Sequence, residues 1–298
     1  MIHSRPFQFF NGDVPLAARV HRNVDDLLEP QPAVLVTGSW LTVKEQMADR
    51  YAAELAARGY TAVTFDFAGW GASGGTPRHA ELPARKIDDI VAVARAVSTL
   101  SFVRPGAIGY LGVCASAQYA LRALAAGAPI ASMVSVAGWF HDTATVAPFY
   151  GGADGVALRL DRAAAAFELY QHTGEVRTVP AYEPGNDRAG MSFELPYYAE
   201  PGRGAVPNWE NAMAEFSWAY WLTFDGLSAA PAVSVPTLFV HSEDCVLPDN
   251  VRHVAAALRG PTEILWADGT QIDFYDQEAQ VTLAVDAADK HYRTTLPS

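Results

Sequence analysis

Cys114 is the residue whose type and neighbours most clearly predict chemistry. It follows a buried apolar run at 108–113 and precedes a helical stretch at 115–126. Gly112 and Ser116, two residues before and after Cys114, are small enough for the close backbone approach of a sharp strand-to-helix turn. A nucleophile at Ser116 is less favoured, because bulky Gln118 would then occupy a position that needs a small residue. The pattern predicts a nucleophilic thiol at this turn.

The predicted position of Cys114 also bears on its reactivity. The positive end of a helix dipole and the unpaired N–H groups of a first helical turn favour the thiolate, which is the nucleophilic form of cysteine. This reasoning predicts an activated thiol. The alternative interpretation is a small core residue, as most free cysteines are.

The segments around Cys114 alternate short β-branched runs with helical stretches, which is typical of a parallel sheet built from βαβ units. Residues 5–11 and 16–22 are expected to pair as antiparallel strands leading into that sheet. The expected strands are 33–37, 61–67, 107–111, 130–136, 236–241 and 263–266, and the expected helices are 44–58, 85–99, 115–126, 250–258 and 277–291.

The alternation stops between residues 139 and 234, a stretch rich in Trp, Tyr and Phe. Structureless loops of such length are rare in compact domains, so this stretch is predicted to be a mainly helical cap. The sheet domain then consists of residues 1–138 and 235–298.

Composition excludes several classes of function. The 298 residues are 50% apolar and carry a formal charge of −12, which repels phosphate backbones and anionic membrane surfaces. The sequence also lacks a secretory signal pattern, a stretch apolar enough to span a bilayer, metal-ligand spacing and a nucleotide-binding motif. With only two cysteines, no disulfide framework is expected. These features predict a cytoplasmic protein without metal, cofactor, nucleic-acid partner or membrane partner.

Several segments of the chain together resemble the α/β-hydrolase superfamily. Within that superfamily they resemble the branch of dienelactone hydrolase-like proteins that carry a cysteine at the strand-to-helix turn. The segments that carry the likeness are 36–40, 65–73, 112–116 and 241–248, and their order and spacing extend it over nearly the whole chain. The resemblance implies an α/β-hydrolase fold, with a mostly parallel central sheet flanked by helices and a mainly helical cap.

The resemblance also implies the rest of an active site. An oxyanion would be held by the backbone N–H of Ala115 and by a second N–H, from Ser39 or Trp40, in the loop after the first buried strand. Asp244 stands where the superfamily carries the acid that orients its catalytic histidine, with Glu243 as a competitor.

The sequence departs from the superfamily at the histidine itself. Gln271 occupies the expected position after the last strand, and the loop there contains no histidine. Glutamine cannot accept a proton at neutral pH, so it can hold a substrate or a water but cannot act as a base.

Three interpretations stay open at this point. Another group could activate Cys114: either Glu45, in a region where dienelactone hydrolase-like proteins keep an acidic residue, or His141. The protein could instead catalyse a cyclisation, an isomerisation or a lyase-type change of a C–C bond, without an acyl-enzyme. It could also bind a small molecule without catalysing any reaction.

The cap aromatics predict an apolar roof over the carboxyl ends of the strands, where ligands bind in such sheets. Trp139 and Trp218, together with His141, are candidate substrate-binding residues, although each tryptophan could equally serve the cap's own core. The expected activity is attack by Cys114 on the carbonyl of a small apolar or aromatic ester, lactone or thioester. A homodimer is left open.

Overall fold

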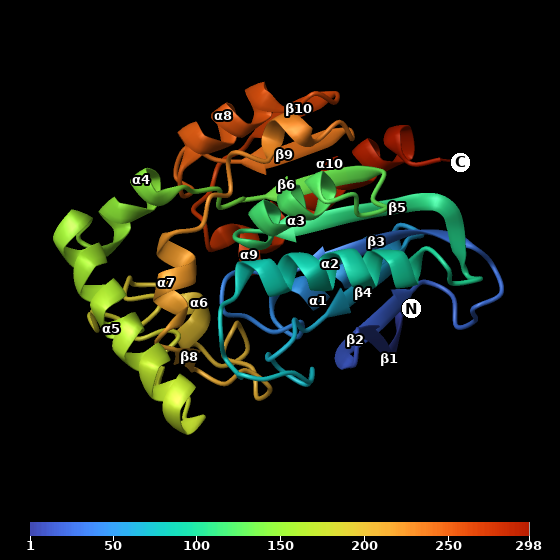
Figure 1. The fold of residues 1–298 in the computed structure, drawn as a ribbon. Coiled ribbons are helices and arrows are strands. Elements are labelled where there is room, and N and C mark those ends of the chain that lie inside the picture. Colours follow the sequence, from blue (N-terminus) through green and yellow to red (C-terminus); the bar gives the residue numbers. More distant parts are fainter. Residues whose placement is uncertain (298) are drawn as a thin grey trace.

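The computed structural model describes residues 1–297 and is built on one eight-stranded sheet, in the order β1-β2-β4-β3-β5-β6-β9-β10 (Figure 1). The pairs β1–β2 and β2–β4 are antiparallel and the other pairs are parallel, which confirms the predicted sheet and its antiparallel entry. The strands are β1 His3–Asn11, β2 Val14–Arg22, β3 Gln31–Thr37, β4 Thr61–Phe65, β5 Val103–Val113, β6 Ser132–Val136, β9 Thr237–His241 and β10 Thr262–Trp266.

Helices cover both faces of this sheet. Helix α1 (Met47–Ala57) packs against α10 (Glu278–Thr295), and α2 (Pro83–Val97) packs against α3 (Ser116–Ala125). Figure 1 shows the second pair in front of the sheet and the first pair behind it, with α8 (Pro248–Ala257) beside β9 and β10. A proline begins both α2 and α8, where its missing N–H leaves no bond unmade.

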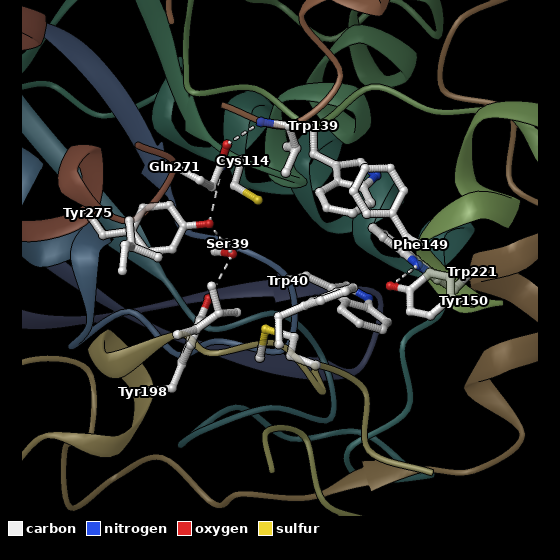
Figure 2. Close-up of a pocket in the computed structure, with 15 residues that line it drawn as sticks. Ser39, Trp40, Cys114, Trp139, Phe149, Tyr150, Tyr198, Trp221, Gln271 and Tyr275 are labelled. Carbon is white, nitrogen blue, oxygen red and sulfur yellow. Dashed lines mark hydrogen bonds between the residues drawn. The ribbon is translucent and has the colours of Figure 1, made fainter. Parts of the chain in front are cut away.

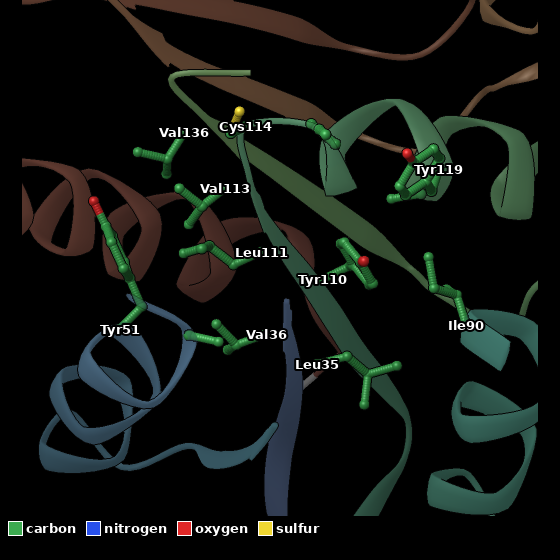
Figure 3. Close-up of a cluster of buried hydrophobic side chains, with 14 of the residues drawn as sticks. Leu35, Val36, Tyr51, Ile90, Tyr110, Leu111, Val113, Cys114, Tyr119 and Val136 are labelled. Atoms are coloured by element: carbon green, nitrogen blue, oxygen red, sulfur yellow. The ribbon is translucent and has the colours of Figure 1, made fainter. Parts of the chain in front are cut away.

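The middle of β5 is buried on both faces of the sheet. Leu111 and Val113 point to the side of Tyr51, which comes from α1, whereas Tyr110 points to the side of Ile90, which comes from α2 (Figure 3). Burial on both faces explains why this strand reads as a continuous apolar run, without polar alternation. Cys114 lies at the end of this strand.

The chain between β6 and β9 forms a cap beyond one end of the sheet (Figure 1). Long loops share this segment with the helices, so it is less regular than a helical bundle. Its elements are α4 Thr143–Val146, η1 Ala147–Tyr150, α5 Gly152–Thr173, β7 Thr178–Val179, α6 Pro196–Ala199, β8 Met213–Ala214, α7 Ser217–Leu222 and η2 Ala230–Ala232. No helix within residues 1–297 combines the length and the apolar character that a bilayer crossing requires.

Candidate active site

The backbone at Cys114 turns from β5 into α3 through a left-handed conformation, with φ +57°. Such a conformation costs a non-glycine residue about 1–2 kcal/mol, and here two hydrogen bonds hold it. The Cys114 N–H donates to the Val136 carbonyl over 3.0 Å, and the Trp139 N–H donates to the Cys114 carbonyl over 3.0 Å. A Cβ on Gly112 would lie 2.9 Å from the backbone nitrogen of Ala117, so the turn requires glycine there.

The Cys114 side chain lines a cavity of about 160 Å³ between the sheet and the cap. Aromatic rings form much of its wall, and Figure 2 shows Trp40, Trp139, Phe149 and Trp221 on one side of the sulfur. Engineered apolar cavities of about 150 Å³ accept benzene, so this one can hold a group of phenyl size. Among the lining side chains, all within residues 1–297, none is charged and none is a histidine.

Burial raises the pKa of the Cys114 thiol above its ordinary value. The hydroxyls of Ser39 and Tyr275 and the backbone N–H groups of Ala115 and Trp40 oppose this rise but do not cancel it. The prediction of an activated thiolate at the helix N-terminus is therefore wrong, because the thiol pKa is raised. Loss of solvation outweighs the helix dipole because the sulfur is almost wholly removed from water.

Two backbone N–H groups lie beside the sulfur, those of Ala115 and Trp40. The N–H of Ser39 is used elsewhere, because it donates to Met47 Sδ over 3.4 Å. Of the two residues considered for the second oxyanion donor, Trp40 therefore has the better placed N–H. Ser39 contributes its side chain instead.

Side-chain hydroxyls form a hydrogen-bonded chain next to Cys114 (Figure 2). Tyr198 Oη donates to Ser39 Oγ over 3.0 Å, and Ser39 Oγ lies 3.1 Å from Tyr275 Oη. Gln271 Nε2 extends the chain by donating to Tyr275 Oη over 3.3 Å. The chain joins α6 of the cap, the loop after β3 and the short helix α9 (Asp273–Asp276).

Gln271 connects three loops at the carboxyl edge of the sheet. Its Nε2 donates to the Ala137 carbonyl over 2.7 Å, and its Oε1 accepts the Val246 N–H over 3.2 Å. Gln271 and Cys114 line the same cavity, which agrees with the position near the thiol that the sequence predicts for Gln271. Asp244, by contrast, is exposed and does not line the cavity.

Glu45, which the sequence offered as a group that could activate Cys114, does not line the cavity. Its carboxylate pairs with Lys44 over 2.8 Å and with Arg19 over 3.3 Å. Lys44 in turn pairs with buried Asp66 over 2.6 Å. Glu45 therefore belongs to a charge network between α1 and the neighbouring strands, which the sequence could not reveal because Arg19 is distant along the chain.

Two of the three candidate substrate-binding residues lie behind the wall of the cavity. His141 accepts from Trp139 Nε1 over 2.7 Å and donates from Nε2 to the Trp221 carbonyl over 2.9 Å. Burial lowers the pKa of His141 to about 4, so the ring is neutral near pH 7. The two hydrogen bonds occupy both ring nitrogens. Trp218 packs 5.8 Å from the ring of Trp40 without lining the cavity, whereas Trp139 does line it.

Sequence reasoning missed two hydroxyl groups of the site, those of Tyr198 and Tyr275. Tyr275 follows Gln271 by four residues, the spacing that brings side chains together over one helical turn, so a signal was present for it. Tyr198 comes from the cap, and no spacing rule connects it to Ser39. Within residues 1–297 there is also no group of three side chains suited to hold a metal ion.

Comparison with known proteins identifies the family. Residues 33–284 match the model described as the alpha/beta hydrolase family. The Pseudomonas aeruginosa protein PA2218 is 27% identical over 91% of this chain and 80% of its own length. Its crystal structure covers 99% of this chain and 94% of that one, with a TM-score of 0.85.

Two further matches have described activities or ligands. The structure of DcsB in complex with its substrate analogue covers 99% of both chains, with a TM-score of 0.84 at 16% identity, and so shares the fold. The acyltransferase drtE of Aspergillus calidoustus is 32% identical over 111 residues, which are 37% of this chain and 36% of the acyltransferase. The match to the family model spans most of the sequence, so this chain belongs to the alpha/beta hydrolase family.

Proposed function

We propose that the protein is an acyl-processing enzyme whose nucleophile is the Cys114 thiol, as in dienelactone hydrolase-like proteins. The observation that carries the proposal is the strained turn at Cys114, which holds the sulfur at an aromatic-walled cavity beside two N–H donors. A cysteine that served only as a core residue would need neither the left-handed backbone nor the cavity.

The proposed first step is attack of the sulfur on a carbonyl bound in the cavity. The carbonyl oxygen becomes an oxyanion and is held by the N–H groups of Ala115 and Trp40. Each donor of this kind is worth roughly 3–4 kcal/mol in the transition state. Collapse of the tetrahedral intermediate breaks the C–O or C–S bond of the donor, expels its alcohol or thiol group, which takes up a proton, and leaves the acyl group on Cys114.

The cavity supports an apolar or aromatic acyl group as the substrate's recognition element. Its rings match a small hydrocarbon or phenyl group, and its lining offers no charged side chain to a carboxylate, a phosphate or an ammonium group. The ester, lactone or thioester carbonyl would lie at the end of the cavity where Cys114, Ser39 and Tyr275 meet.

A second candidate is transfer or cyclisation, with a hydroxyl group of another molecule or of the acyl chain itself as acceptor. One observation favours it over hydrolysis: the apolar lining of the cavity disfavours water relative to an organic acceptor. The partial similarity to an acyltransferase is consistent with this candidate.

Intact-protein mass spectrometry tests the proposal. After incubation with short aryl and alkyl thioesters, lactones and esters, the wild-type protein should gain the mass of one acyl group. Cys114→Ala should gain none, and Cys114→Ser should acylate far more slowly, because an alcohol is a weaker nucleophile than a thiol. The matched control is Cys245→Ala, which removes the other buried cysteine and should acylate as the wild type does.

The fate of the acyl group separates the two candidates. With an added alcohol of increasing concentration, transfer predicts that ester product replaces acid product, whereas hydrolysis predicts acid throughout. Turnover of the same size in Cys114→Ala and in the wild type would contradict covalent catalysis altogether.

A further inference from the structure

The chain of hydroxyls beside Cys114 has a defined direction. Val246 N–H donates to Gln271 Oε1, which fixes the amide so that its Nε2 points to Tyr275 Oη. Tyr275 Oη therefore accepts one hydrogen bond, and Ser39 Oγ accepts another, from Tyr198.

The hydroxyl protons that remain determine which proton transfers this series of hydrogen bonds allows. Ser39 and Tyr275 each have one hydroxyl proton, and a single proton suffices for the bond between their oxygens. One hydroxyl proton is left for the sulfur side, where both residues line the same cavity as Cys114. When Tyr275 donates to Ser39, the pair can take a proton from the thiol at Tyr275 Oη and release another from Ser39 Oγ.

We propose, on the basis of the function proposed above, that Tyr275 is the catalytic residue that accepts the thiol proton and passes its own proton through Ser39 to the leaving group, and that the enzyme is consequently selective for thioesters and aryl esters. Gln271 is its positioning residue. Tyr275 is the better carrier than Tyr198, because Tyr198 donates to Ser39 and reaches the sulfur only through it.

The proposed step balances without a base that stores the proton. As the bond between Cys114 Sγ and the carbonyl carbon forms, the thiol proton moves to Tyr275 Oη and the Tyr275 hydroxyl proton moves to Ser39 Oγ. The Ser39 hydroxyl proton moves to the leaving sulfur or oxygen, and the C–S or C–O bond of the donor breaks with its electron pair on that atom. A neutral thiol or phenol departs, and Tyr275 and Ser39 are again neutral.

The selectivity follows from whether the leaving group must be protonated before it can depart. A thiolate leaves readily because its conjugate acid has a pKa near 8.5. An alkoxide is nearly as basic as hydroxide, far more basic than a thiolate, so it must be protonated as the bond breaks. A histidinium can supply that proton. Burial raises the pKa of Tyr275 well above its ordinary value, which makes it a much weaker acid than a histidinium.

A series of donors with one acyl group and different leaving groups tests this selectivity. For butyryl donors, the alkyl thioester and the p-nitrophenyl ester should acylate Cys114, and the ethyl ester should react at least about 100-fold more slowly in kcat/KM. Equal rates for the ethyl ester and the thioester, with the acyl group still found on Cys114, would overturn the inference and leave the proposed function standing. Absence of an acyl adduct with every donor would instead remove the proposed function.

Tyr275→Phe tests the role of the hydroxyl. It should lower the acylation rate by about 10²–10⁴-fold, and the rate that remains should rise steadily with pH, because only thiolate formed in advance can attack. The wild-type rate should stay nearly flat from pH 6 to 9. Tyr220→Phe, at an exposed position on α7, is the matched control and should behave as the wild type. A Tyr275→Phe variant with the wild-type rate and pH profile would overturn the proposal.

Because Tyr275 is buried, a measurement on the unaltered protein complements the variant. Acylation rates in mixtures of H₂O and D₂O should follow a downward-curved dependence on deuterium fraction, since more than one proton moves in the same step. A straight line would mean that one proton moves, and would overturn the relay.

Discussion

The left-handed backbone at Cys114 directs its sulfur into the cavity, while burial of that sulfur disfavours the charged form. A reactive cysteine usually resolves this conflict with an adjacent histidine. Here the buried imidazole of His141 has both nitrogens engaged by Trp139 and Trp221. The resting site is therefore a neutral thiol among neutral hydroxyls.

The resting thiol gives the first prediction. Alkylation of Cys114 by iodoacetamide should be slow at pH 7 and should keep accelerating above pH 9, because only the thiolate reacts and burial raises the thiol pKa. Mass spectrometry of the Cys245→Ala variant, which leaves Cys114 as its one thiol, measures the rate, with N-acetylcysteine as reference. A plateau at or below pH 8 would contradict the raised pKa.

At the scale of elements, the turn between β5 and α3 gives the second prediction. Gly112→Ala should destabilise the fold by about 1–3 kcal/mol and slow acylation of Cys114, because its Cβ would meet the backbone of Ala117. Gly127→Ala is the control, because alanine at this position is strained by a φ of +82° but its Cβ would meet no atom within 4 Å. It should lose stability in urea without losing acylation per folded molecule. Equal acylation rates in the two variants would contradict the need for glycine at the turn.

The cap gives the third prediction, through the ring of Phe149 on η1. Phe149 lines the cavity and packs 4.9 Å from the ring of Trp139, so Phe149→Ala should lengthen the space for the acyl chain. The ratio of kcat/KM for octanoyl to butyryl thioesters should rise by about tenfold. Tyr220→Ala, on α7 and away from the cavity, is the control and should leave the ratio unchanged. An unchanged ratio in Phe149→Ala would place the acyl chain elsewhere.

The helices and strands of the sheet were largely predictable from the sequence. The contacts between the cap and the loops at the edge of the sheet were not. Buried parallel strands leave a local apolar signature, and the turn at Cys114 leaves a local pattern of small residues, so both could be read from neighbours in the chain. The bond between Tyr198 and Ser39 joins residues 159 positions apart. The expected role of Glu45 failed because its carboxylate pairs with Arg19 and Lys44, and the pairing with Arg19 could not be read from neighbours in the chain.

At the scale of the whole molecule, the fourth prediction concerns stability in acid. His141 has a pKa of about 4 in the folded protein and about 6.5 when unfolded. Between these values the unfolded chain binds more protons, so stability rises with pH. This contribution is fully present above pH 6.5 and is lost as pH falls towards 4, by up to about 3 kcal/mol.

Urea unfolding of wild type and His141→Gln measures that contribution. The wild type should lose more of its unfolding free energy than the variant as pH falls from 6.5 to 4, so the difference between them should narrow. His253→Gln, at an exposed position on α8, is the control and should keep the wild-type slope. Parallel slopes for wild type and His141→Gln would show that His141 is not the group concerned. A homodimer and a cytoplasmic location stay predictions from the sequence.

The bond from the Trp139 N–H to the Cys114 carbonyl constrains how molecules reach the sulfur. Trp139 lies three residues after the end of β6, so the segment between β6 and β9 is tethered near its start to the turn itself. A cap that swung outward as one body would drag on this tether and disturb the aim of the nucleophile. The outer wall is instead made by a loop with Met191 and exposed Phe193. A substrate that entered through that loop would leave the turn at Cys114 undisturbed.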